Sequence, residues 1–407
     1  MPTTKPMGQY QVAVIAEAVQ GTQTAIDLTS AFLRVLGSEI GEGGREISFV
    51  NVARKDRGRF LEVDGRYKDV SWKLDLPLIG SGTAGTALVP RGALWTNAAG
   101  LSVVDGESSV IYEADDNNPA GSVSIMRVDR VPIVADYLVN AIAAQVALEF
   151  TKDGPPKLSF SGTAARKHQF CKTTLAAAIV AADATAMTLT DLTCIVDGSA
   201  TDVITGLHIF AKIDSEIVKI TGYTKSTGVC VIARAQLGST GATHLISASV
   251  SPMNSDKDGL IPTYNEDDGK LIGAMDWSVK LNTVAIKCTK VTITINTGRK
   301  FDPLSSGESQ STGINNGAIE VTASLEMIMD TTRFKVFQMG DSRTDCDIEL
   351  IAGTTAGSIF TIDLDKCRIK SVTPPNLAPN EIGNVTVTFD CFDTLGALLG
   401  QFKLTES

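Results

Sequence analysis

The sequence predicts a mainly β protein of the β-sandwich or barrel kind, and three observations support this class. Apolar and polar residues alternate with period two in several segments, which is the pattern of strands with one buried face. Convincing helical periodicity is scarce. Only 6% of the residues are aromatic, so Val, Ile, Leu and Thr must pack the sheets, as they do in sandwiches and barrels.

Six segments carry the alternation. It is clearest over residues 71–76 (SWKLDL), 291–296 (VTITIN), 319–327 (IEVTASLEM) and 385–391 (VTVTFDC), and weaker over 158–161 and 360–364. Helical patterns are confined to two places. Residues 132–149 are expected to hold one helix at most, and the Ala-rich residues 173–183 form either a helix or a linker.

A length of 407 residues, with 43% hydrophobic and 20% charged residues, is typical of a globular chain of two or three domains. The longest apolar run, residues 176–182, is interrupted by Asp183, far short of the roughly 20 residues that cross a bilayer. No membrane span is therefore expected. Residues 1–6 lack the pattern of a secretory signal, so we expect the chain to stay in a cytoplasm until assembly.

The cysteines and the charge exclude several function classes. The seven cysteines are odd in number, widely spaced and without C-x-x-C, and with three histidines this predicts buried free thiols rather than disulfides or zinc. A net charge of −10 argues against tight binding of a nucleic-acid backbone. The alternative of an acidic wall along which DNA slides without binding is left open. The cysteines are Cys171, Cys194, Cys230, Cys288, Cys346, Cys367 and Cys391.

A second unit is predicted inside the first. Residues 170–252 contain few large aromatic side chains and read as short strands joined by tight turns. Loops accept such insertions more readily than strands do. The predicted organisation is a first part of the main β domain (1–169), an inserted small β domain (170–252) and a second part of the main domain (253–407).

One segment looks like a dinucleotide fingerprint. Residues 80–85 (GSGTAG) fit G-x-G-x-x-G, follow a predicted strand and precede Asp105 by twenty residues. However, residues 71–75 alternate polar and apolar side chains where a buried parallel strand should be almost wholly apolar, and residues 90–92 (PRG) interrupt a following helix. We therefore interpret residues 80–85 as a flexible loop, with an enzyme that uses it as an alternative.

Other chemistry-bearing patterns favour structural interpretations. Residues 254–259 (NSDKDG) resemble the start of a calcium loop, but Asn265 stands where a bidentate Glu belongs, so a solvated acidic turn is expected. The carboxylate pairs at 115–116 and 267–268 are predicted to be solvated loops. The sequence contains no G-x-S-x-G motif that would indicate nucleophilic catalysis. His244 near Arg234 is expected to make a structural contact. No enzyme and no cofactor are expected; the other histidines are His168 and His208.

Taken in order, the segments resemble the tail tube proteins of long-tailed bacteriophages. The resemblance covers most of residues 8–168 and 265–407, which makes 1–169 and 253–407 two parts of a tail tube domain. Within the inserted unit, residues 213–222 and 233–244 resemble a small β module that recurs in phage structural proteins. The segments of the main match are 70–76 with 80–85, 93–100 (ALWTNAAG), 156–162 (PKLSFSG), 276–282 (DWSVKLN), 291–299 and 319–327.

The resemblance implies a β-sandwich whose inner sheet joins those of its neighbours, so that a ring, expected to be hexameric, encloses one barrel. Ring closure would remove exposed sheet edges. It also implies rings stacked into a conduit for DNA, which passes without tight binding. The implied partners are further copies of the chain, a tape measure protein and tail terminator or baseplate proteins. The implied location is the virion tail, assembled in the cytoplasm of the host bacterium.

Two placements stay open within this hypothesis. Glu320, Thr322, Ser324 and Glu326 share one face of a predicted strand and either line the lumen, where carboxylates would repel DNA phosphates, or lie on the outer surface. The candidates for bridging successive rings are residues 39–60 and 299–317, which are long, polar and glycine-bearing.

The alternative function is a virion decoration or adhesion protein whose inserted unit binds a host surface glycan. Its sign would be a cluster of exposed aromatic side chains that stack on sugar rings. The inserted unit offers only Phe170, Phe210 and Tyr223 for this role.

Overall fold

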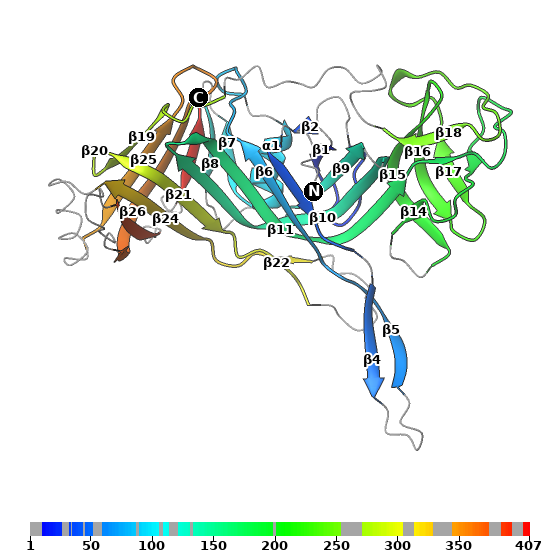
Figure 1. The fold of residues 1–407 in the computed structure, drawn as a ribbon, viewed down its shortest axis with the longest axis horizontal. Helices are drawn as coiled ribbons and strands as arrows, with labels where there is room; N and C mark the ends of the chain where they lie inside the picture. The colour runs from blue at the N-terminus through cyan, green and yellow to red at the C-terminus, as the bar shows by residue number, and fades with distance from the viewer. Residues whose placement is uncertain are drawn as a thin grey trace, which may run out of the picture.

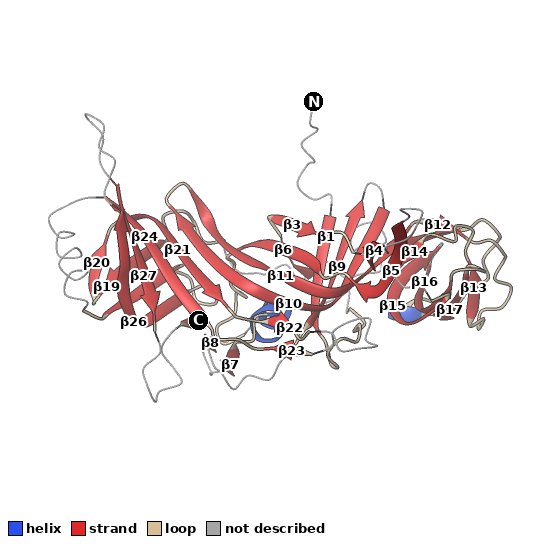
Figure 2. Cartoon of the chain, turned by 90° about the horizontal axis from the view of Figure 1, so that it is seen from below, coloured by secondary structure: helices blue, strands red, loops and turns tan. Residues whose placement is uncertain are grey.

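The predicted fold class is confirmed, because strands make up 61% and helices 4% of the described residues (Figures 1 and 2). The computed structural model describes residues 10–26, 32–33, 35–43, 45–51, 59–86, 89–105, 109–113, 121–130, 133–197, 201–253, 271–303, 313–328, 344–373, 384–392 and 402–407. The four clearest alternating segments lie on strands β6, β21, β24 and β27, whose bounds follow.

Eight antiparallel strands form one continuous sheet, here called the long sheet, which curls into a half-barrel. It is the frame on which the rest of the chain is built. In spatial order its strands are β3 (Gly37–Ile40), β6 (Val70–Pro77), β11 (Gly154–Cys171), β10 (Ile133–Thr151), β21 (Cys288–Asn296), β24 (Glu320–Ile328), β27 (Asn384–Cys391) and β26 (Phe360–Thr373).

Further strands branch from the long sheet and fold over it. On the first half of β10 the chain adds β9 (Val123–Arg130), β1 (Tyr10–Ala16) and β2 (Phe32–Leu33). On the first half of β26 it adds β25 (Cys346–Ala352), β19 (Trp277–Leu281) and β20 (Val284–Ile286), and on the other side β28 (Lys403–Glu406), β8 (Val110–Glu113) and β7 (Ser102–Asp105). The result is two layers with a core between them.

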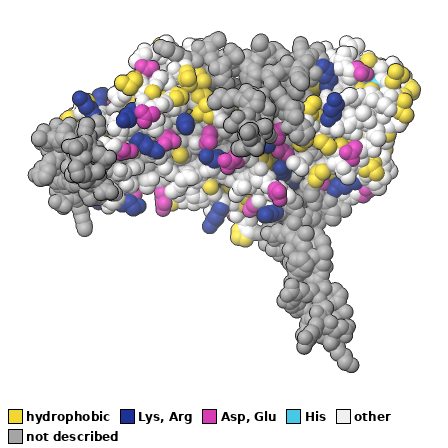
Figure 3. Space-filling model, viewed as in Figure 1, with side chains coloured by type: hydrophobic (Ala, Val, Ile, Leu, Met, Phe, Trp, Pro, Cys, Tyr) yellow, Lys and Arg dark blue, Asp and Glu magenta, His cyan; other side chains and the backbone are white. Residues whose placement is uncertain are grey.

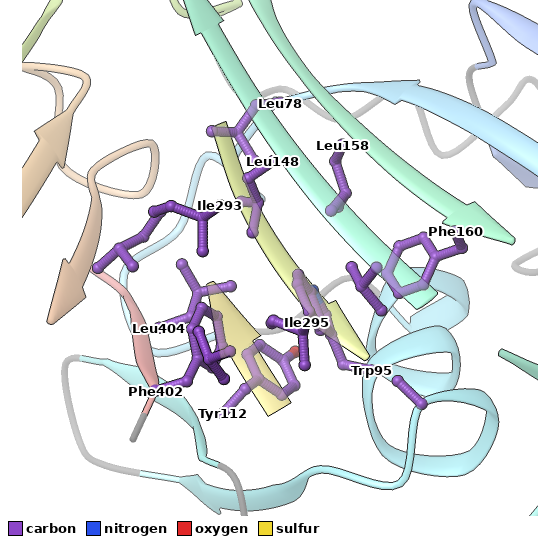
Figure 4. Packing of buried hydrophobic residues seen from close by; sticks show 14 of the residues in the cluster. Leu78, Trp95, Tyr112, Leu148, Leu158, Phe160, Ile293, Ile295, Phe402 and Leu404 are labelled. Carbon is purple, nitrogen blue, oxygen red and sulfur yellow. The ribbon is translucent and has the colours of Figure 1, made fainter. Parts of the chain in front are cut away.

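The main core follows directly from the alternation. Along β24 the side chains of Val321, Ala323, Leu325 and Met327 are at most 2% exposed, and the residues between them point the other way. Large aromatic side chains close the core where the layers meet: Trp95 stands edge-on to the Phe160 ring at 5.0 Å, with Tyr112 and Phe402 beside it (Figure 4).

The prediction of a helix within residues 132–149 is wrong, because residues 133–149 belong to the strand β10. Residues 135–143 are buried without a break, since one face meets the main core and the other meets the inserted unit. A strand buried on both faces loses its period-two pattern and cannot be told from a helix by periodicity. A bulge after Leu138, with Asn140 at a φ of 56°, further interrupts the alternation.

The chain between Thr173 and Pro252 builds a separate six-stranded sheet. Its strands lie in the order β12 (Thr173–Thr174), β18 (Ser249–Pro252), β15 (Val203–Ile213), β16 (Glu216–Thr224), β17 (Val229–Ala233) and β13 (Ala186–Thr188). A two-residue strand, β14 (Ile195–Val196), instead pairs with the end of β11. The core of this six-stranded part is continuous with the outer face of β1, β9 and β10, where Ala13, Met126 and Tyr137 are buried. We keep the name inserted unit for this part.

Helical structure is limited to short pieces. The main one runs from α1 (Val89–Ala93) into a π-helical turn (Leu94–Ala98) and plugs one end of the core with Leu94 and Trp95. Among the described residues no helix has the length and apolarity needed to cross a bilayer.

Two hairpins leave the long sheet. β4 (Arg45–Asn51) and β5 (Arg59–Tyr67) form an arm that extends well away from the body (Figure 1). The shorter hairpin pairs β22 (Lys300–Phe301) with β23 (Ile314–Asn315). Of the two segments proposed from the sequence as bridges, residues 299–317 contain the shorter hairpin, and residues 39–60 contain β4 and the first two residues of β5.

Candidate assembly surface

The long sheet carries a polar surface on the side opposite the core. Glu320, Thr322, Ser324 and Glu326 lie together there on β24, as the alternation predicts. Their neighbours across the sheet are polar too: Ser324 lies between Thr292 on β21 and Thr388 on β27.

Hydroxyl groups dominate this surface, which we call the hydroxyl face. On the adjoining strands the Ser159 hydroxyl donates to a carboxylate oxygen of Asp75 at 2.5 Å. The pattern continues from β6 to β27 because β6, β21, β24, β27, the second half of β10 and the facing part of β11 keep the same alternation. The Ser and Thr side chains of the face are Ser71, Thr151, Ser159, Ser161, Thr163, Thr292, Thr294, Thr322, Ser324, Thr386 and Thr388.

Charges of both signs alternate across the hydroxyl face. Lys290 pairs with Glu149 on the neighbouring strand at 2.5 Å, and Lys73 pairs with Asp75 at 3.2 Å. The side chains of these partners are 29–44% exposed, so each pair contributes roughly 0–1 kcal/mol. Figure 3 shows basic and acidic side chains interspersed over the described part of the face in view. Their physical consequence is a wettable surface without a continuous basic stripe.

The long sheet has open edges among the described residues. At one end, β3 pairs with β6 along one side only. At the other end, the second half of β26 pairs with β27 along one side only. Ile40 on β3 and Val372 on β26 are half-buried, in contrast to the fully buried side chains in the middle of the sheet. Unpaired edges of this kind are templates for another strand.

Two buried arginines fasten the segment before residue 170 to the segment after 270. Arg91 on α1 forms an ion pair with Glu406 on β28, both 3% exposed, and also donates to the Ile79 carbonyl. Arg299 donates to the carbonyls of Ala98, at 2.6 Å, and Gly121. Burial lowers the pKa of Arg299 to about 10, and the carbonyl contacts satisfy its charge. Neither contact could be predicted from local sequence patterns.

The glycine loop at residues 80–85 has a structural explanation. A Cβ on Gly80 would lie 2.0 Å from the Gly357 carbonyl oxygen, so only glycine lets the two backbones approach. The same carbonyl accepts from the Gly82 amide at 2.9 Å, and Gly82 has a φ of 76°. The loop is thus packed against the turn at residues 353–358.

The inserted unit contains a buried ionic cluster around Glu216. Its carboxylate accepts from Arg234 and from the Ala242 amide at 3.0 Å, and lies 2.9 Å from His244 Nε2. Burial by itself would raise the pKa of Glu216, but the hydrogen bonds from Arg234 and His244 lower it to about 2. The predicted structural contact between His244 and Arg234 is therefore mediated by Glu216.

Other residues singled out from the sequence do not gather into a site. Tyr223 and Phe170 are at most 1% exposed and Phe210 is 8% exposed. His168 is fully buried, and this burial, followed by the charge of Arg166, lowers its pKa well below the ordinary value. The calcium-like segment 254–259 with Asn265, and the carboxylate pairs at 115–116 and 267–268, lie outside the described residues. Within those residues no group of His, Cys, Asp and Glu is arranged to hold a metal ion.

A buried carboxylate that the sequence did not suggest fixes the bulge of β10. Glu17 accepts from the hydroxyls of Ser122, at 2.6 Å, and Ser124, at 2.8 Å, and from the Asn140 amide at 2.7 Å. Four donors, including the Gly21 amide, satisfy this carboxylate. The bulge is therefore held by specific bonds.

No protein-family model and no curated protein match the chain. One solved structure that is similar to part of it is the sheath/tube terminator of an extracellular contractile injection system, PVC, in the extended state. The sequence identity is 13%, the TM-score is 0.25, and the match covers 33% of this chain and 94% of that chain. A TM-score of this size assigns neither family nor function.

Proposed function

We propose that the chain is a structural subunit of a phage-type tail tube, which polymerises into stacked rings and forms a conduit for DNA. The observation that carries the proposal is the long sheet: eight strands with one apolar face, one hydroxyl face and, within the described part of the chain, an open edge at each end. The backbone groups of those edges have no strand partner among the described residues, and copies joined edge to edge would satisfy them.

The hydroxyl face suits the inner wall of such a tube. Glu320, Thr322, Ser324 and Glu326 line the lumen in this proposal, together with the hydroxyls of the neighbouring strands. Strong DNA binding requires Lys and Arg contacts to many phosphates. Because Lys290 and Lys73 are already paired with Glu149 and Asp75, the face offers DNA a hydrated surface without a set of free cations.

The two hairpins are the proposed contacts between stacked rings. The β4–β5 arm extends beyond the two-layered body (Figure 1). In this proposal it contacts the adjacent ring of the stack, which the sheet edges within one ring do not reach. The expected partners are therefore further copies of the chain, both within a ring, hexameric by the resemblance, and between rings. The other proposed partners are a tape measure protein and tail terminator or baseplate proteins. The proposed location is the virion tail, assembled in the host cytoplasm.

Electron microscopy of the purified protein tests it. Rings or tubes with a central channel, which appear as the protein concentration rises, are the expected result, with mass photometry following the loss of monomer. A protein that stays monomeric at high concentration, with added tail initiator proteins as well as without them, would contradict the proposal.

The glycan-binding alternative finds less support. It requires aromatic side chains that are free to stack on sugar rings. Phe170, Phe210 and Tyr223 instead form part of the core of the inserted unit.

A further inference from the structure

Two segments of the chain follow the same strand order. We name β1, β2, β3, β6, β9, β10 and β11 the first unit, and β19, β20, β21, β24, β25, β26 and β27 the second unit. Counted along the chain, the spatial order in both units is third, fourth, seventh, sixth, fifth, first, second. In both units a hairpin, β4–β5 or β22–β23, lies between the third and fourth strands.

The irregularities of the sixth strands match as well. On β10 the register against the fifth strand shifts after Leu138, and the register against the seventh strand shifts after Ala143. On β26 the corresponding shifts follow Leu364 and Ile369, at the same spacing. Bulges are specific features of a fold, so two at matched positions mark two copies of one unit.

The two units are joined inside the chain by a strand pair. The second half of β10, the sixth strand of the first unit, pairs with β21, the third strand of the second unit. Val146 lies opposite Ile295 and Leu148 lies opposite Ile293, and all four side chains are 0% exposed. This pairing is what makes the long sheet continuous.

The equivalent strands at the two ends of the chain have no such neighbour among the described residues. They are the second half of β26, which corresponds to the second half of β10, and β3, which corresponds to β21. The matched registers make Val372 the counterpart of Val146 and Ile40 the counterpart of Ile293. Val372 and Ile40 are only half-buried, as expected of an interface that lacks its second side.

We infer that the chain consists of two copies of one tube-wall unit, and that β26 of one chain pairs antiparallel with β3 of the next, repeating the junction between β10 and β21. The occupant of each open edge is thus a second copy of this chain. The inference rests on the proposed function and specifies the contact through which it would work.

The internal junction also supplies the register of the contact between chains. Transferred to the open edges, it places Gly41 opposite Thr373, Glu42 opposite Val372 and Gly43 opposite Ser371 of the neighbouring chain. Glu42 takes the place of Ile295, whose backbone faces β10, so Glu42 and Val372 form a hydrogen-bonded pair.

The contact is heterologous, because one chain offers β26 and the other offers β3. Such contacts close into rings when the rotation between units permits. Each chain brings two units, so a ring of six wall units, the size that the resemblance implies for single-unit subunits, needs three chains and not six. The wall would then contain two similar units per chain, so its approximate rotational symmetry is twice that of the chains. The inserted unit occurs once per chain and does not follow this higher symmetry.

Cysteine cross-linking tests the register. A hydrogen-bonded pair has Cα atoms about 5.5 Å apart, within the range that a disulfide spans. Glu42→Cys and Val372→Cys, placed on separate chains and mixed under oxidising assembly conditions, should give covalent dimers and nothing larger. The double variant should give a ladder of multimers. The unsubstituted chain controls for its seven own cysteines, five of them buried and Cys171 and Cys288 half-buried.

A displaced pair provides the matched control. Asp365→Cys lies on β26 seven residues before Val372, about 23 Å along the strand, and should not cross-link to Glu42→Cys. Rings that form without the cross-link between positions 42 and 372, or with equal yields for both pairs, would overturn the inference and leave the proposed function standing. If no rings form under any condition, both fail.

Discussion

Val146 on β10 lies opposite Ile295 on β21, and the two fully buried side chains close the only strand junction between the two units that the described registers contain. In the chain the residues are 149 positions apart. Their counterparts at the open edges are Val372 and Glu42, which the inference above brings together on different chains. The contrast between a completed and an incomplete junction yields a matched pair of substitutions.

Ile293→Ala should lower the free energy of unfolding of the single chain by about 3 kcal/mol, because it opens a cavity at a fully buried site. Ile40→Ala should cost the single chain less, about 1 kcal/mol, but should raise the concentration at which rings form. Urea titration and mass photometry measure the two effects. An Ile40→Ala chain that assembles like the parent would show that β3 is not an interface.

Arg91→Met should destabilise the chain by about 4 kcal/mol, because it leaves the Glu406 carboxylate buried beside α1 without its cation. Adding Glu406→Gln should recover much of this loss, since the uncompensated charge is then gone. Chemical denaturation of both single variants and the double variant gives the coupling free energy. Additive losses would mean that the pair does not fasten α1 to β28.

Acid should unfold the inserted unit through Glu216. Its pKa of about 2 lies below the ordinary glutamate value of about 4.3, so the folded state gains stability above pH 4.3 and loses it as the pH falls towards 2. Glu216→Gln should remove that pH dependence while lowering the stability at neutral pH by about 3 kcal/mol. Thermal melts of the parent and the variant between pH 2 and 7 measure both.

Charge reversal on the hydroxyl face should show which side of the tube it lines. Tubes carrying Glu320→Lys and Glu326→Lys should retain single-stranded DNA that resists nuclease and is released by salt. Asp183→Lys with Asp202→Lys, at exposed positions of the inserted unit, makes the same change in net charge and should retain none. DNA that binds the first variant but is fully digested would place the face on the outside.

The fold class and the difference between the two faces of the sheet could be predicted from the sequence. The reason is that strands β6, β21, β24 and β27 expose one face and bury the other. β10 could not, since both of its faces are buried over nine residues and the alternation disappears. The junction between β10 and β21 joins segments that are far apart in the chain, and local patterns carry no information on such pairings.

The duplication was hidden for a related reason. The seventh strands align through backbone register, but Phe160 on β11 corresponds to Val387 on β27 and Gly162 to Phe389. The two units therefore keep their topology and bulges while their side chains have diverged, as cores permit when total volume is conserved. Only the pairing of strands reveals the relationship.

A cryo-EM map of the assembled particle, at a resolution that separates strands, would show which strand follows β26 in the wall. We expect one unbroken barrel in which the strand after β26 is β3 of the next chain, with Val372 opposite Glu42. A particle in which both strands end against solvent or against a different protein, with each chain closed on itself, would contradict it.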